Sequence, residues 1–126
     1  MRVFKNKWFN RWARREDISD SVLCDAVKEI IAGEVEGNLG GCLFKKRLPR
    51  TGEGKRRGYR VLVGYRRPNV QRIIFLYAFA KSGKANVSDR EEAALGLAAE
   101  SFISAVDEQV TKLLAINSVW EVQCYE

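Results

Sequence analysis

The residues best suited to chemistry in this chain are basic and aromatic, and they concentrate in its middle. Between Lys45 and Arg72 the sequence holds 11 Lys and Arg residues against one acid, Glu53. Cations at this density repel one another unless water or an anion screens them. Phosphate is the natural ligand for such a set, and interleaved aromatic rings can stack on nucleic-acid bases. The aromatic residues expected to stack are Tyr59, Tyr65, Tyr77 and Phe79.

The loop around Gly52-Glu53-Gly54-Lys55 has two interpretations. Glycines let a backbone approach a phosphate closely, and a lysine adds a point charge to that contact. Arg56 follows Lys55, so the GxxxxGK[ST] spacing of a nucleotide-binding P-loop is absent. An ordinary hairpin loop, flexible through glycine and solvated through lysine, fits the spacing equally well.

Lys81 ends an apolar segment, and its placement is also open to two interpretations. Alternation along a strand predicts that it shares a face with Ile73, Phe75, Tyr77 and Phe79. A lysine that extends to solvent from a strand end is common. The functional alternative is a general base or acid near neutral pH, because neighbouring cations and partial burial disfavour its protonated form. Tyr77 is expected to project the same way.

Several residue types are absent or few. There is no histidine, which excludes His-based triads, His proton shuttles and most catalytic zinc sites. The three cysteines, Cys24, Cys42 and Cys124, are widely spaced and form no CxxC motif. We expect all three to be reduced core thiols, with no disulfide scaffold, no metal site and no cofactor.

The helices that must position these residues are predicted from apolar spacing and caps. Trp8 and Trp12, with Phe9 beside them, predict a short amphipathic helix over 7–15. Ser19 is the expected N-cap of a second helix that ends at Gly33. Ser88-Asp89-Arg90-Glu91 matches a capping box and opens a third helix. Its expected inward residues are Leu95, Ala98, Ala99, Phe102 and Val106.

The strands are predicted over 1–4, 42–48, 59–65 and 73–81. The second has Leu43, Lys45 and Arg47 on one face, and the fourth is apolar on both faces. A helix over 108–115 and a strand over 119–122 are expected to finish the chain. The sequence therefore predicts an α+β fold with an antiparallel meander in the middle, in a single domain over 1–126, with about 103–126 as a helix and strand extension.

Length and charge place this domain in a broad class. The chain has 126 residues, 46% of them hydrophobic, and a formal net charge of +6. Residues 1–84 hold 20 Lys and Arg against 8 Asp and Glu, whereas residues 85–126 hold 2 against 8. No apolar run approaches a membrane span, and the N-terminus has no apolar signal region. We expect a cytoplasmic protein with one anion-seeking face.

Five segments of the chain, taken in order, resemble a bacterial toxin family. They are Met1 to Phe9, Ile18-Ser19-Asp20, Leu39-Gly40-Gly41, Gly52 to Arg60 and Tyr77 to Lys81. Together they are similar to the RelE-like branch of the RelE/ParE superfamily, close to the HigB-type toxins of type II toxin–antitoxin modules. The resemblance runs from Met1 to about Phe102.

This resemblance implies a compact fold with a twisted antiparallel sheet, two N-terminal helices and C-terminal helices. It also implies a metal-independent mRNA endoribonuclease, in many members acting on mRNA in the ribosomal A site. By position, Lys55 and Arg60 match phosphate and transition-state contacts, and Lys81 matches a strand-end catalytic cation. Tyr77 is a further catalytic candidate. The expected RNA-binding residues are Lys45, Lys46, Arg47, Arg50, Arg56, Arg57 and Tyr59, although Arg57 stands where the family usually has a small residue.

The implied partners are mRNA, the ribosome and a cognate antitoxin, which in the HigB-like branch usually carries a helix-turn-helix DNA-binding domain. An acidic antitoxin segment could contact the basic face, or the antitoxin could dock on the Trp8/Phe9/Trp12 helix, whose tryptophans are more often plain core. Two other functions stay open. One is a non-catalytic toxin of the superfamily that binds a protein target such as DNA gyrase; the other is a nucleic-acid-binding module on the same fold.

Overall fold

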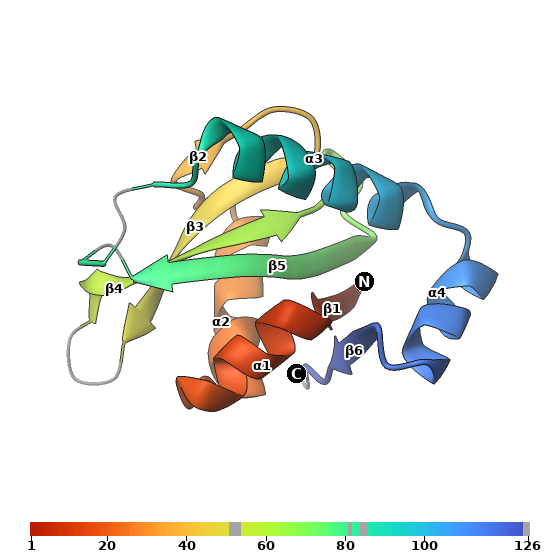
Figure 1. Ribbon diagram of the computed structural model, residues 1–126, viewed down its shortest axis with the longest axis horizontal. Coiled ribbons are helices and arrows are strands. Elements are labelled where there is room, and N and C mark those ends of the chain that lie inside the picture. Colours follow the sequence, from red (N-terminus) through yellow and green to blue (C-terminus); the bar gives the residue numbers. More distant parts are fainter. Residues whose placement is uncertain (51–53, 81, 84–85, 125–126) are drawn as a thin grey trace.

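One six-stranded sheet runs through the protein, with helices on both of its sides (Figure 1). The structure is a computed structural model that describes residues 1–50, 54–80, 82–83 and 86–124, with the backbone alone at 54–57. The strands lie in the order β2-β3-β4-β5-β1-β6. Their bounds are Arg2–Asn6 (β1), Gly37–Asn38 (β2), Leu43–Arg50 (β3), Gly54–Gly64 (β4), Arg72–Ala80 (β5) and Val119–Val122 (β6).

The sheet confirms the predicted α+β fold and its central meander, since β3, β4 and β5 pair antiparallel. Two features of the sheet depart from the prediction. β1 pairs with β5 in parallel, so the sheet is mixed. β2 is a two-residue strand on the outer edge of β3, where no strand was predicted.

The helices are α1 (Lys7–Arg15), α2 (Asp20–Ile31), α3 (Asp89–Ser104) and α4 (Asp107–Ala115). Both predicted caps are confirmed: the Ser19 hydroxyl accepts from the Val22 N–H, and Ser88 forms a full capping box with Glu91. Gly33 follows the end of α2 with φ +91°, a conformation that favours glycine.

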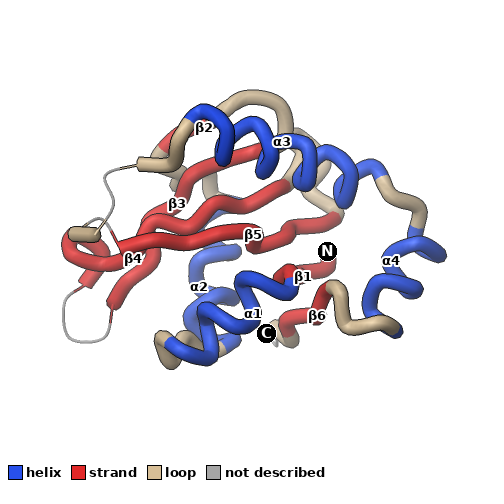
Figure 2. The backbone as a smooth tube through the Cα atoms, in the orientation of Figure 1, coloured by secondary structure: helices blue, strands red, loops and turns tan. Residues whose placement is uncertain are grey.

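The two faces of the sheet are covered by different helices (Figure 2). α1 and α2 pack on one face, where Phe9, Trp12 and Leu23 are buried. α3 packs on the other face through Ala99 and Phe102. We call these the α1/α2 face and the α3 face.

The alternation along β5 changes phase at a bulge. Ile73 and Phe75 belong to the core on the α1/α2 face, but Tyr77 and Phe79 pack on the α3 face. The register explains the change, because Leu62 pairs with Tyr77 and Val63 with Phe75, which leaves Leu76 without a partner. The prediction that all four aromatic and apolar residues share one face was therefore wrong.

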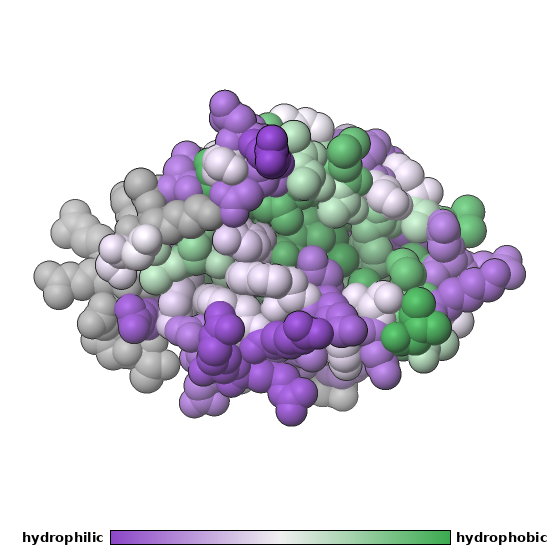
Figure 3. Space-filling view, viewed as in Figure 1, coloured by the Kyte–Doolittle hydropathy of each residue, from purple (hydrophilic) through white to green (hydrophobic). Residues whose placement is uncertain are grey.

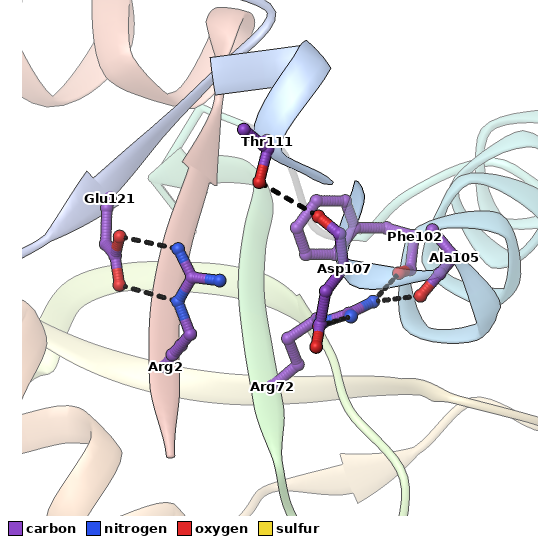
Figure 4. A network of polar contacts seen from close by, with 7 residues as sticks. All are labelled: Arg2, Arg72, Phe102, Ala105, Asp107, Thr111 and Glu121. Carbon is purple, nitrogen blue, oxygen red and sulfur yellow. Dashed lines mark hydrogen bonds and ion pairs between the residues drawn. The ribbon is translucent and has the colours of Figure 1, made fainter. Parts of the chain in front are cut away.

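The C-terminal third returns to the sheet through a polar network (Figure 4). Arg72 on β5 donates from one Nη to the carbonyl oxygens of Phe102 and Ala105, at 2.8 and 2.7 Å, and from the other to Asp107. Both carbonyls lie at the C-terminal end of α3. Arg72 supplies a donor to the Ala105 carbonyl and a second donor to the Phe102 carbonyl, which also accepts from the Ala105 N–H. Arg2 on β1 forms a bidentate pair with Glu121 on β6.

A disulfide joins Cys24 of α2 to Cys124, just after β6. The expectation of three reduced core thiols was wrong for this pair and holds only for Cys42, which is free and buried. The physical reason lies in topology: β6 pairs with β1, which brings the chain end beside α2 with a Cα–Cα separation of 5.5 Å, within bridging range. A sequence separation of 100 residues gave no sign of this.

Along the described residues, no helix is both long enough and apolar enough to cross a membrane.

Candidate functional site

The α3 face of the meander brings cations and aromatic rings into one row. In register, Arg60 of β4 lies between Arg47 of β3 and Phe79 of β5. In the next row Lys45 lies beside Leu62, which pairs with Tyr77. The sheet therefore brings the predicted catalytic residues Arg60 and Tyr77 onto a common face.

Arg60 is buried on this face, at 3% exposure. Its Nε donates toward the Glu36 carboxylate at 2.9 Å. Its Nη1 is also buried and has no hydrogen-bond partner in the described part of the protein. A buried donor left without a partner costs about 1–3 kcal/mol, and an acceptor oxygen that reached this nitrogen would remove that cost. The nitrogen is closed to solvent in this arrangement, so an anion reaches it only when the surrounding side chains move.

Glu36 also holds Arg47, whose Nε lies 3.5 Å from the other carboxylate oxygen. The Arg47 side chain is half exposed. One carboxylate thus bridges two arginines that face each other across β3 and β4, and it offsets repulsion between like charges placed directly opposite. The two arginines and Glu36 together carry one net positive charge.

The aromatic end of the site involves α1. The ring of Tyr77 lies 4.4 Å from the ring of Trp8 and 6.4 Å from that of Phe79. The Tyr77 hydroxyl reaches the Glu91 carboxylate on the first turn of α3 at 3.4 Å. Trp8 is 41% exposed, whereas Trp12 is buried, so the two tryptophans of α1 have different environments.

Two of the predicted RNA contacts lie on the opposite, α1/α2 face. Lys46 is buried and paired with Glu29 of α2 at 2.7 Å. Tyr59 is buried against Trp12, and its hydroxyl donates to Glu16 at 2.7 Å. Neither side chain is accessible to RNA in this arrangement, because both are buried, Lys46 against an acid of α2 and Tyr59 against the acid that directly follows α1.

The hairpin end of β3 and β4 holds the remaining candidates. Arg50 is exposed, lies 5.6 Å above the Tyr59 ring and pairs in register with Gly54. The backbone of Lys55, Arg56 and Arg57 continues β4 from there. The side chains of these three residues, and Lys81 after Ala80, lie outside the described residues.

The whole chain, not this face alone, was compared with known proteins. A family model described as the RelE toxin of the RelE / RelB toxin-antitoxin system matches residues 1–122. The chain belongs to the RelE toxin family. No curated protein and no solved structure matched it. RelE toxins act within toxin–antitoxin systems, are generally mRNA-cleaving endoribonucleases, and have a cognate antitoxin as partner.

The basic segment of this RelE toxin is more neutralised than its sequence predicts. Arg66 pairs with Glu100 and Ser104 of α3, and Arg72 is used by the network of Figure 4. Tyr65 is fully buried and stacked on Phe44, so it does not stack on a base. The acids that pair with these cations come from outside the 45–72 segment. The net charge of that segment alone therefore overstates the positive charge of the folded surface.

Cys42, the free thiol of the toxin, lies beside this ion pair. Burial, then the hydrogen bond to Glu100 at 3.0 Å, raises the pKa of the Cys42 thiol. The same hydrogen bond is the main cause that lowers the pKa of the Glu100 carboxyl, ahead of Arg66. Cys42 is therefore a protonated donor at neutral pH and a poor nucleophile.

Residue-level reasoning missed Glu36 and the exposure of Trp8. Glu36 directly precedes β2 and matches no sequence motif. The pairing of β2 with β3 brings it to Arg47 and Arg60. Among the described residues, no group of three or more acidic or cysteine side chains is arranged to hold a metal ion.

Proposed function

We propose that this RelE toxin is a HigB-type, metal-independent endoribonuclease that cleaves mRNA through attack by the RNA's own 2′-OH. The family membership supports a nuclease, and the buried Nη1 of Arg60 is the observation that supports a phosphate site on the α3 face. Arg60 is the phosphate contact in this proposal. Glu36 is a positioning residue, because its bond to Nε fixes the plane of the guanidinium.

The proposed reaction needs three groups. A base takes the proton of the 2′-OH, whose oxygen forms a bond to phosphorus; the bond from phosphorus to the 5′ oxygen breaks, and an acid protonates that oxygen. Lys55 or Lys81 is the base, and Arg60 stabilises the charge on the phosphorane. The other lysine, or Tyr77, is the acid. The products are a 2′,3′-cyclic phosphate and a 5′-OH.

The proposed RNA path uses the exposed cations. Lys45 and Arg47 lie at or near the surface of β3 on the α3 face, and Arg50 lies over the Tyr59 ring at the hairpin end. Arg56 and Arg57, which follow along β4, are added to the path by their place in the sequence. Lys46 and Tyr59 are left out of this path because both are buried and paired on the α1/α2 face. Trp8 is added to it as an exposed ring beside Tyr77, since stacking on an aromatic ring is tolerant of base identity.

The proposed setting is the bacterial cytoplasm, with mRNA on the ribosome as substrate and a helix-turn-helix protein as antitoxin. The alternative function is a toxin that binds a protein target such as gyrase. It needs no phosphate site and gives no reason for the unpartnered Nη1 of Arg60.

The test is inducible expression in a bacterial host, comparing the wild type with the triple variant Lys55→Ala/Arg60→Ala/Lys81→Ala. Primer extension on cellular mRNA reports cleavage. We expect growth arrest and new mRNA 5′ ends with the wild type only. Growth arrest with intact mRNA would instead support the target-binding toxin.

A further inference from the structure

Three of the described residues lie around the Arg60 side chain on the α3 face. Arg47 on β3 and Phe79 on β5 flank it in register, and its Nε donates toward Glu36 at 2.9 Å. Phe79 is buried in the core of this face, whereas the Arg47 side chain is 46% exposed. Of the two flanking side chains, Arg47 is therefore the one that can turn into solvent without opening the core.

An open hollow of about 430 Å³ lies at the edge of β3, next to the residues that β2 covers. Its lining residues are Glu34, Val35, Glu36, Lys46 and Arg47. Arg60 is paired with Glu36 and lies opposite Arg47, yet it does not line the hollow itself. Glu36 and Arg47 thus separate the Arg60 guanidinium from this open space.

The surroundings of the hollow suit a charged ligand. Figure 3 shows mainly hydrophilic atoms over β2 and the start of α3, whereas the hydrophobic surface lies farther along α3, toward α4. The lining includes two cations. Lys46 is buried and paired with Glu29 of α2, so Arg47 is the one that an incoming phosphate group meets.

Glu36 holds its two arginines unequally. The Nε of the buried Arg60 lies 2.9 Å from one carboxylate oxygen, and the Nε of the half-exposed Arg47 lies 3.5 Å from the other. An exposed ion pair adds little to stability because water competes for both partners, whereas breaking a buried pair leaves an uncompensated charge in the core. An anion that attracts Arg47 can therefore break the outer contact while the inner contact stays in place.

We propose that Arg47 and Glu36 form a latch over Arg60, which an RNA phosphate opens by drawing Arg47 away from Glu36. Glu36 stays on the Arg60 Nε and keeps the guanidinium oriented, while the departure of Arg47 gives the phosphate access to Nη1. No covalent bond changes in this step. The latch rests on the proposed RNA function, because it regulates entry to the phosphate site of that function.

Chemical modification of the protein alone tests the closed latch. Phenylglyoxal reacts with accessible guanidinium groups, and mass spectrometry of a digest gives the reaction rate at each arginine. We expect Arg60 to be protected in the wild type and to react about 10-fold faster, or more, in Arg47→Ala. Arg66→Ala is the matched control, since Arg66 is also a half-exposed arginine paired with a carboxylate, and it should leave Arg60 protected. Equal rates at Arg60 in the wild type and Arg47→Ala would overturn the proposal.

The opening of the latch is measured in the wild type through the side-chain NMR signals of the two Nε–H groups, assigned with Arg47→Lys and Arg60→Lys. The ligand is an RNA oligonucleotide with 2′-fluoro groups, which stays intact because it lacks the attacking hydroxyl. We expect its binding to shift the Arg47 signal and to leave the Arg60 Nε–H protected from exchange with water.

An unchanged Arg47 signal in the saturated complex, or loss of protection at the Arg60 Nε–H, would overturn the latch. No binding of the oligonucleotide would overturn the phosphate site itself, and the opening by RNA with it. Protection of Arg60 by Arg47 in the modification experiment would then stand on its own, so the two failures are distinguishable.

Discussion

Arg60 differs from Lys46 and Arg72 because one of its buried donors has no partner among the described residues. Lys46 is fully buried against Glu29, and Arg72 directs both terminal nitrogens to partners. Within the described part of the chain, the Arg60 Nη1 has no partner, and Arg60 pairs in register with Phe79. At the scale of single residues, this is the feature that separates a candidate phosphate contact from a structural ion pair.

We expect Arg60→Lys to lower the RNA cleavage rate about 10-fold to 100-fold, because lysine keeps the charge but loses the planar fork. The initial rate of cleavage measures this. Arg66→Lys is the matched control, since Arg66 is an exposed cation paired with Glu100, and it should retain the wild-type rate. An equal loss in both variants would refute a specific role for Arg60.

The sequence predicted which residues of β3 share a face but not the environments of those residues. The strand pattern placed Lys45 and Arg47 correctly on one face, opposite Lys46. It did not predict that Lys46, Tyr59 and Arg60 are buried. Their acidic partners come from the residue after α1, from α2 and from the turn after α2, and no local pattern links residues that far apart in the chain.

At the scale of elements, the helix caps could be predicted because a cap is a local interaction within four residues. The bulge in β5 could not, since it results from the pairing of two strands. The close approach of α3 to the sheet is also a tertiary feature. A Cβ on Gly64 of β4 would lie 2.9 Å from the Ala99 Cβ and 3.1 Å from Ile74.

We expect Gly64→Ala to lower the free energy of unfolding by about 1–3 kcal/mol, because α3 must move away from β4. Gly96→Ala is the matched control. Gly96 lies inside α3 with open space around it, so alanine there should raise stability by about 0.5–1 kcal/mol. Urea denaturation measures both, and destabilisation by Gly96→Ala would contradict the described packing of α3.

Arg72 connects the end of α3 and the start of α4 to β5 (Figure 4). We expect Arg72→Ala to cost about 2–4 kcal/mol of unfolding free energy, because it leaves the Ala105 carbonyl without its donor, removes one of the two donors to the Phe102 carbonyl and breaks the ion pair with Asp107. Arg66→Ala removes a well-exposed pair and should cost less than about 1 kcal/mol. Similar losses of unfolding free energy in the two variants would contradict a special contribution of the Arg72 network to stability.

At the scale of the whole molecule, two contacts join distant parts of the chain at its ends. The Cys24–Cys124 disulfide attaches the C-terminal end to α2, and the Arg2–Glu121 pair attaches β6 to β1. The sequence predicted β6 but not its place in the sheet, because a four-residue strand carries no information on which neighbour it pairs with.

Reduction of the disulfide should lower the free energy of unfolding by about 2–4 kcal/mol, since the unfolded chain regains the freedom that the cross-link removes. Urea curves with and without dithiothreitol measure this. Cys24→Ser should abolish the effect of the reductant, and Cys42→Ser should preserve it. Identical curves for the wild type in both conditions would contradict the disulfide.

Acid should weaken the contact between β1 and β6. The hydrogen bonds from Arg2 are the main cause that lowers the pKa of Glu121 below its ordinary value of 4.5. The unfolded chain therefore takes up a proton that the folded chain does not, so this stabilisation is complete well above pH 4.5 and is lost as pH falls further. Urea denaturation at a series of pH values measures this. In Glu121→Gln the free energy of unfolding should fall less between neutral and acid pH than in the wild type, and an equal fall in both would contradict the role of Glu121.

The central claim is that this protein cleaves RNA through the 2′-OH at the α3 face. The most direct measurement is to incubate the purified protein with a 5′-labelled mRNA, free and bound to ribosomes, and with the same mRNA carrying 2′-deoxynucleotides in the A-site codon. We expect cleavage of the all-ribose mRNA to a 2′,3′-cyclic phosphate, protection of the deoxy-substituted codon, and loss of cleavage in the Lys55→Ala/Arg60→Ala/Lys81→Ala variant. Cleavage within the deoxy codon, or an intact mRNA in every condition, would contradict the claim.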